Sequence, residues 1–120
     1  MLDASKSITI TCSWYDGNAD VDRETSFTLD GVSVHFERAA SASGSGITAS
    51  YLAKIRIPFR SGYLPWEKWM EQQKAKPGNN AFWTLCIGAT VLVDGESKTI
   101  LRCHDNTGRR FCPHWYVEAR

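Results

Sequence analysis

Alternation of apolar and polar residues runs through most of the chain, and this period of two predicts strands with one buried face. The first example is SITITCSW, residues 7–14, which places Ile8, Ile10 and Cys12 opposite Thr9 and Thr11. A second example is YLAKIRIPF, residues 51–59, which places an alanine and two isoleucines opposite a leucine, a lysine and an arginine. We therefore expect a strand at each of these two segments.

The second half of the chain is rich in short segments of the same kind. They are FWTLCIG, ATVLVDGE, KTILRCHD and FCPHWYVEA, which begin at residues 82, 89, 98 and 111. Glycine or aspartate residues separate most of these segments, as is usual at turns. Together with the first half, the pattern predicts seven or eight short strands.

The segment TSFTLDGVSVHF, residues 25–36, predicts a hairpin. Its Asp30-Gly31 pair suits a type I′ turn, which needs positive φ at both central residues. Such a turn would pair Leu29 with Val32 and Phe27 with Val34, and it would bring all four, with Phe36, onto one face. We expect this face, including Val34, to be part of the core.

Two segments break the strand pattern. LPWEKWMEQQKAKPG contains a proline suited to a first turn, apolar residues at helical spacing and a final Pro-Gly stop, so it predicts a short helix at about residues 65–75. ERAASASGSGITAS, at about residues 37–50, has small residues and no apolar face, so it predicts one long, flexible loop. The fold class predicted for residues 1–120 is therefore mainly β: one small β-barrel or sandwich domain of about seven short strands, with one short embedded helix and one long loop.

Composition and charge narrow the function classes. The 120 residues include 14 Lys+Arg and 13 Asp+Glu, a net charge of +1, which is low for a free nucleic-acid binder. Residues 1–35 contain six acidic and two basic residues, whereas the remainder contains seven acidic and twelve basic ones. A molecule with such separated charge could stack head to tail with copies of itself or with a neighbouring protein. The alternative is chance clustering of charge on a solvated surface. The sequence predicts no signal peptide and no transmembrane helix, so we expect no membrane partner.

Four residues near the end of the chain are of types that bind zinc: Cys103, His104, Cys112 and His114. Cys103 and His104 are adjacent, so on a strand they face opposite sides and at most three of the four could converge. We therefore expect no metal and no cofactor. The sequence contains no nucleophile elbow, Walker loop or dinucleotide fingerprint, and we expect no catalytic residue and no enzyme.

A module that binds nucleic acid or sugar remains an open hypothesis. Arg109 and Arg110 are neighbours in a predicted turn, Arg38 begins the predicted loop, and five Trp and four Tyr residues could stack on bases or sugars. We expect Trp66 and Trp69 instead to hold the helix against the sheet.

The order of several short motifs resembles a known family. FWTLCIGATVLVDGE leads into KTILRCHDNTGRRFCPHWYVEA, and LDGVSVHFERAASASGSG and YLAKIRIP stand upstream at matching places. From about Ile8 to Glu118, this arrangement resembles small minor structural proteins, also described as neck or head-tail connector proteins, of tailed bacteriophages and prophages. One difference is that the residues CIGA, 86–89, replace the polar Gly-Asp turn that is common in that family.

The resemblance implies a virion structural protein of the head-tail connector. Such proteins are small β-barrels that form rings below the portal and act as stopper, head-completion or tail-completion components. It implies partners that are copies of the chain itself and neighbouring portal, adaptor and tail proteins, with assembly in the bacterial host cytoplasm and a final location in the virion neck. A channel loop at residues 37–50 could contact packaged DNA non-specifically. The alternative is a monomeric β-barrel binding module for nucleic acid or carbohydrate.

Overall fold

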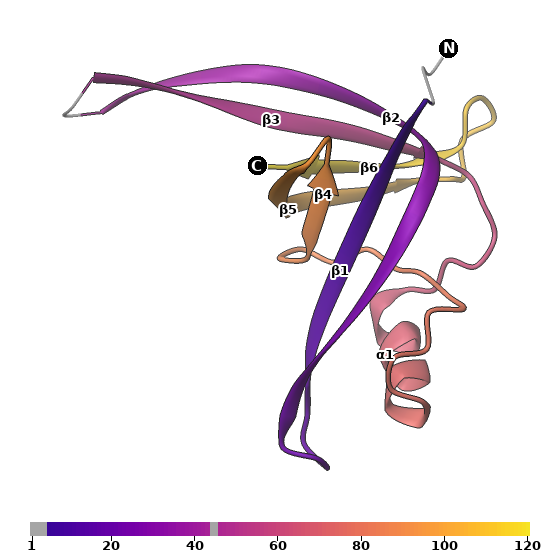
Figure 1. The fold of residues 1–120 in the computed structure, drawn as a ribbon. Coiled ribbons are helices and arrows are strands. Elements are labelled where there is room, and N and C mark those ends of the chain that lie inside the picture. Colours follow the sequence, from indigo (N-terminus) through magenta and orange to yellow (C-terminus); the bar gives the residue numbers. More distant parts are fainter. Residues whose placement is uncertain (1–4, 44–45) are drawn as a thin grey trace.

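Six antiparallel strands form a closed barrel beside one short helix (Figure 1). The computed structural model describes residues 5–43 and 46–120, with the side chains of residues 38–51 left out of the description. Around the barrel the strands follow the order β1-β2-β3-β6-β5-β4. The elements are β1 Lys6–Asp16, β2 Val21–Ser43, β3 Gly46–Pro58, α1 Trp66–Ala75, β4 Thr90–Val93, β5 Glu96–Asn106 and β6 His114–Ala119. The prediction of a mainly β fold with a small barrel and one short helix is confirmed.

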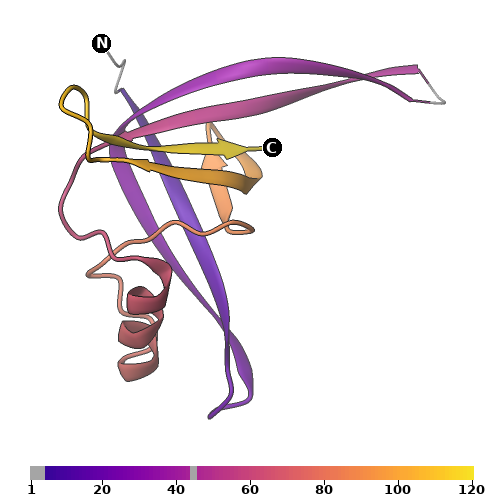
Figure 2. The ribbon, with the colours of Figure 1, turned by 180° about the vertical axis from the view of Figure 1, so that it is seen from behind.

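Two long hairpins extend beyond the barrel wall. β4 pairs with β1 only at residues 8–11, so residues 12–25 of β1 and β2 continue as a two-stranded ribbon. β6 pairs with β3 only at residues 53–58, so residues 37–43 and 46–52 form a second two-stranded ribbon. We call these the β1–β2 arm and the β2–β3 arm. The two views in Figures 1 and 2 show them leaving the barrel in different directions.

The hairpin predicted at Asp30-Gly31 is wrong, although the shared face is right. β2 runs through these residues without turning, and Lys6 pairs with Val32 while Ile8 pairs with Leu29. Two residues of β2, Asp30 and Gly31, therefore lie opposite one residue of β1, which is a β-bulge. Gly31 has a φ of 68°, the left-handed conformation that such a bulge favours. At this point β2 passes from pairing with β1 to pairing with β3.

The predicted long loop at residues 37–50 is also wrong. Residues 37–43 pair in continuous antiparallel register with residues 46–52, so this segment is strand. The ladder needs only backbone hydrogen bonds, which small residues can make without an apolar face. The tip of the predicted loop, residues 44–45, lies outside the described residues.

The number of strands and their lengths need correction as well. The structure has six strands in its described part, and β2 and β3 are long, at 23 and 13 residues. The predicted strand at residues 82–88 is irregular and contributes one isolated bridge, between Trp83 and Tyr63. The predicted last strand begins at His114 rather than at residue 111.

The alternation predicted for residues 7–14 and 51–59 is confirmed, because its apolar members form the barrel core. Ile8, Ile10 and Cys12 are buried, and so are the alanine and isoleucines of β3. Phe27, Leu29 and Val32 are buried too, and Val34 and Phe36 pack against the core as partly buried side chains.

Helix α1 confirms the helix predicted at residues 65–75. Pro65 immediately precedes it, and Gly78, with a φ of 83°, lies just beyond its end. Trp69 is fully buried and meets the Phe27 ring edge-on at a centroid distance of 6.4 Å. Trp66 is partly buried against the core, so both tryptophans hold the helix to the barrel. In the described part of the chain, no helix has the length and apolarity needed to cross a bilayer.

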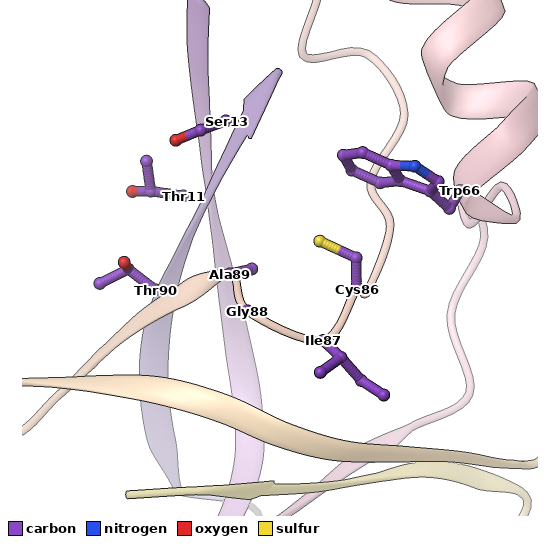
Figure 3. A pocket seen from close by; sticks show the side chains of 8 residues that line it. All are labelled: Thr11, Ser13, Trp66, Cys86, Ile87, Gly88, Ala89 and Thr90. Carbon is purple, nitrogen blue, oxygen red and sulfur yellow. The ribbon is translucent and has the colours of Figure 1, made fainter. Parts of the chain in front are cut away.

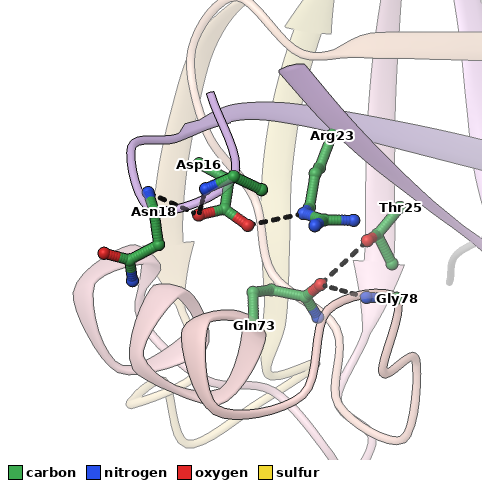
Figure 4. A network of polar contacts seen from close by, with 7 residues as sticks. Asp16, Asn18, Arg23, Thr25, Gln73 and Gly78 are labelled. Carbon is green, nitrogen blue, oxygen red and sulfur yellow. Dashed lines mark hydrogen bonds and ion pairs between the residues drawn. The ribbon is translucent and has the colours of Figure 1, made fainter. Parts of the chain in front are cut away.

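A buried polar network also fixes the helix to the β1–β2 arm (Figure 4). The Gln73 side chain is fully buried, and its Oε1 accepts hydrogen bonds from Thr25 Oγ1 at 2.9 Å and from the Gly78 backbone N–H at 3.1 Å. Buried polar groups are stable only when they are hydrogen-bonded in this way. The base of the arm and the end of the helix are thus held as one unit.

Candidate functional site

Arginine and aromatic side chains gather at one end of the barrel, where the loop between β5 and β6 meets the end of β3. Phe111 and Phe59 are 79% and 64% exposed, and the Arg110 guanidinium lies 5.8 Å from the Phe111 ring centroid. The Phe59 backbone N–H donates to the Pro113 carbonyl at 3.0 Å, which joins the two segments. We call Phe59, Arg109, Arg110 and Phe111 the arginine–aromatic end.

This end has the composition of an interaction surface. Phe59 stacks on the buried ring of Trp115 at 5.8 Å, so its position is set by the core although its outer face is exposed. Aromatic and arginine side chains dominate the binding energy of protein interfaces, and the same pair of side-chain types can stack on bases. The turn predicted around Arg109 and Arg110 is therefore an exposed feature beside two exposed rings.

The tip of the β1–β2 arm has the opposite charge. It contains four acidic residues and one basic residue, a net charge of −3. Arg23 Nε donates to Asp16 Oδ2 at 2.7 Å, and this contact, with the Ala19 and Asn18 backbone N–H groups, holds the pKa of the Asp16 carboxyl below its usual range (Figure 4). The exposed carboxylates are those of Asp20, Asp22 and Glu24.

The acidic tip and the arginine–aromatic end lie at opposite ends of the molecule. Figures 1 and 2 both show the β5–β6 loop at the top and the tip of the β1–β2 arm at the bottom. These two local clusters of opposite charge are thus separated in space.

Three of the four cysteines belong to the barrel core or pack against it. Cys12 on β1 is buried in the core, and Cys86 and Cys103 are partly buried and pack against the same core. The neighbouring Cys12 and the Ala89 N–H lower the pKa of Cys86, while burial opposes them. Cys86 and burial raise the pKa of Cys12, and burial, helped by Cys86, raises that of Cys103 to about 11. All four cysteines are free thiols.

The residues 86–89, which differ from the phage family pattern, form a tight turn. The Ala89 N–H donates to the Cys86 carbonyl at 3.3 Å, and Gly88 has the positive φ, 93°, that the third position of a type II turn requires. Two further backbone hydrogen bonds hold this turn to Ile100 of β5, from Gly88 at 2.8 Å and to Ala89 at 2.9 Å. Cys86 is therefore fixed in place by the backbone.

A cavity of about 410 Å³ opens beside this turn. The Cys86 thiol lies in its wall, with Trp66 of α1 on one side and Thr11 and Ser13 of β1 on the other (Figure 3). Figure 3 shows the Cys86 sulfur pointing from the turn towards β1. A small solute in the cavity can thus reach this thiol.

The four residues considered for zinc lie in different environments. His114 is buried, and its Nδ1 donates to the Cys112 carbonyl at 2.6 Å, so its Nε2 is left to accept from the Asn106 amide at 3.4 Å. His104 and Cys112 are exposed, and Cys103 is partly buried against the core. Across the described residues, no group of three or more His, Cys, Asp or Glu side chains is placed to hold a metal ion. The Arg38 side chain, considered for nucleic acid, lies outside the described side chains.

The fold and these surfaces define a class: a small closed β-barrel with two projecting two-stranded arms and oppositely charged ends. The chain belongs to DUF6751, a family of unknown function, whose family model matches residues 4–120. None of the curated proteins matches the chain.

Proposed function

We propose that the chain is a structural protein of the tailed-phage virion, a head-tail connector component that assembles as a ring, helps to close the DNA-filled head and joins the tail. The observation that carries this proposal is the pair of arms that extend from a closed barrel. A barrel has no strand edges of its own, so the arms supply the edges through which it can join neighbours.

The pairing of the arms supports contacts between subunits. In the described strands, residues 12–16 of β1 and 46–52 of β3 are paired along one side. Their other sides present backbone N–H and C=O groups to which a neighbouring chain can add a strand. Such backbone pairing gives a directional contact that requires no large apolar patch.

The oppositely charged ends support a ring. Contact between the acidic tip of one copy and the arginine–aromatic end of the next would be heterologous, and heterologous contacts close into rings when the rotation between subunits allows it. The β2–β3 arm leaves the barrel in another direction, so it is free to reach the ring axis and the packaged DNA, or a portal, adaptor or tail protein. The resemblance in motif order supports the rest of the proposal, which is assembly in the bacterial host cytoplasm and a final location in the virion neck.

The test is to delete the gene from the tailed phage or prophage that encodes the chain and to examine the particles by electron microscopy. We expect DNA-filled heads that lose their DNA and lack tails, and rescue by the chain supplied from a plasmid. Cryo-electron microscopy of rescued particles should then place the barrel in a ring in the neck. Infectious, tailed particles from the deletion strain would contradict the proposal.

The alternative is a monomeric binding module for nucleic acid or carbohydrate. It is favoured by one observation, the exposure of Phe59 and Phe111 beside two arginines. Fluorescence titration with single-stranded oligonucleotides and with oligosaccharides separates the two proposals. Saturable binding by a monomer, lost in Phe111→Ala, would support the module in place of the connector.

A further inference from the structure

The cavity beside β1 leads to an inference that rests on the proposed function and names the contact between neighbouring subunits of the ring. We propose that the cavity is the socket for Phe111 of a second copy of the chain. Arg109 and Arg110 of that copy then pair with Glu24 and Asp22 beside the socket. Each copy thus offers Phe111 to one neighbour and receives Phe111 from the other.

The lining of the cavity suits an aromatic ring. The cavity has a volume of about 410 Å³, and its wall includes the Trp66 indole and the Ile87 side chain (Figure 3). Ile87 is 71% exposed, so an apolar group that covers it removes apolar surface from water. Among the described residues, those that line the cavity carry no acidic or basic side chain. A ring can therefore enter without displacing water from an ion.

Both apolar walls of the socket are fixed within the folded chain. The Trp66 ring stacks on the buried Trp69 ring, with 5.3 Å between the centroids and 24° between the planes. The turn that carries Ile87 is held to Ile100 of β5 by the backbone hydrogen bonds of 2.8 and 2.9 Å. A preformed socket has little conformational entropy to lose when a partner binds.

Two carboxylates lie on the β1–β2 arm next to the socket. Ser13, which lines the cavity, pairs with Glu24 of β2, and the next pair on the same face is Tyr15 with Asp22. Side chains of paired residues lie side by side, and successive pairs on one face are roughly 7 Å apart along the strands. Glu24 and Asp22 are both exposed. The socket therefore has negative charge at its edge on the side of the arm.

The β5–β6 loop carries the matching group. Phe111 is 79% exposed and directly follows Arg109 and Arg110, and the Arg110 guanidinium is 5.8 Å from the Phe111 ring centroid. When this ring enters the socket, the two guanidinium groups arrive at its edge, where the carboxylates lie. Charge complementarity of this kind orients a contact, and aromatic and arginine side chains contribute most of the binding energy of interfaces.

The loop and the socket of one copy lie apart, so the contact joins two copies. Figures 1 and 2 show the β5–β6 loop at one end of the barrel, away from the start of β4 and the turn that precedes it. Two different surfaces meet in such a contact, which makes it heterologous, and repetition of a heterologous contact closes a ring when the rotation allows it.

The first test traps the contact as a disulfide in purified particles. Ser13→Cys puts a thiol at the edge of the socket, and the exposed native Cys112 follows Phe111 directly. Under mild oxidation with copper phenanthroline, we expect a ladder of linked oligomers of the chain. Ser13→Cys combined with Cys112→Ser should give no ladder, and neither should Ser97→Cys, which is equally exposed on β5.

The outcomes of this test separate the two proposals. Immunoblots first show whether the chain is in tailed particles, which the proposed function requires. If the chain is present but Ser13→Cys gives no ladder, the socket is wrong and the connector function stands. A link from this position to a different virion protein would also overturn the inference. A chain absent from the particles would overturn both proposals.

A second test exchanges the charges. Asp22→Arg with Glu24→Arg should cause loss of the chain from particles, and addition of Arg109→Glu with Arg110→Glu to the same chain should restore it, because opposite charges face each other again. Glu71→Arg with Glu96→Arg, added to the Arg109 and Arg110 changes in place of the arm changes, restores the net charge at other exposed positions and should not rescue. Circular dichroism checks that every variant is folded. Folded chains in which the exchange gives no more rescue than this control would overturn the pairing.

Discussion

Leu29 and Val32 lie three residues apart on β2, and both side chains are buried, with exposed fractions of 5% and 0%. In a regular strand, residues three apart point to opposite faces. The bulge at Asp30 and Gly31 adds the one residue that restores the inward direction, and it does so where β2 changes partner from β1 to β3. The bulge therefore keeps both side chains in the core at the point where β2 changes partner.

Replacement of Gly31 tests the bulge. Gly31→Ala puts a Cβ on a residue with a φ of 68°, and the left-handed conformation costs an L-residue roughly 1–2 kcal/mol. We expect the free energy of unfolding in urea to fall by about this amount. Gly108→Ala is the matched control, because its added Cβ would meet no atom within 4 Å, and it should be neutral. Equal effects of the two substitutions would contradict the special role of Gly31.

The sequence predicted the barrel class, the helix and the alternating core because these depend on local periodicity. It misplaced the Asp30-Gly31 hairpin because a glycine with positive φ suits a type I′ turn and a bulge equally well. The choice between them depends on β1 and β3, which pair with β2 from separate parts of the chain. Similarly, the β2–β3 arm is invisible to a search for apolar faces, since its ladder is made by the backbone.

The place of Cys86 in the cavity wall was missed for a related reason. Cys12 and Cys103 stand at inward positions of strands, where cysteine is usual as a small buried residue. The position of Cys86 depends on how the turn at residues 86–89 is tied to β5, and no spacing in the sequence encodes that contact. The replacement of a polar turn by CIGA was the one visible signal, and it marked the residue that lines the cavity.

Asp16 should make stability depend on pH in the acid range. Arg23 lowers the pKa of this carboxyl below 3.8 in the folded chain, so the unfolded chain binds its proton at higher pH. The stabilisation is complete above the unfolded pKa and is lost as the pH falls through the folded one. Asp16→Asn keeps an acceptor for the turn but removes the charge. We expect wild type to unfold at higher urea than this variant at about pH 7, and the difference to shrink at about pH 2.5.

The control for this prediction is Asp22→Asn, which changes an exposed carboxylate on the same arm. Its effect should be small at both pH values, because exposed charges contribute little to stability. A difference between wild type and Asp16→Asn that stays constant from neutral to acid pH would mean that the charge of Asp16 is not the stabilising feature.

Reversal of charge at the arginine–aromatic end tests its place in assembly. Arg109→Glu with Arg110→Glu would set two carboxylates against the acidic surface that we propose as the partner, and like charges brought together at an interface oppose binding. We expect an intact fold by circular dichroism and loss of the chain from purified particles on immunoblots. Lys68→Glu with Arg120→Glu changes the net charge equally at other exposed positions and should leave incorporation unchanged. Normal incorporation of the Arg109 and Arg110 variant would leave this end as a solvated turn.

The β2–β3 arm can be shortened without disturbing the barrel, because its register is known. Residues 40–43 pair with residues 46–49, so deletion of both sets removes four matched pairs and brings residues 44–45 onto the pair formed by Ala39 and Ser50. An even number of pairs keeps every remaining side chain on its original face, and the arm becomes about 14 Å shorter. The barrel core lies outside the deleted segment, so we expect the melting temperature to stay close to that of wild type.

If the arm reaches the ring axis and obstructs the channel, complemented particles should fill with DNA and then lose it before tails attach, which nuclease sensitivity of the filled heads would show. If the arm instead joins neighbouring subunits, the ring should be missing from the neck in electron micrographs. Infectious particles in normal yield, with DNA protected from nuclease, would exclude both roles and would confine the function of the chain to the barrel and the β1–β2 arm.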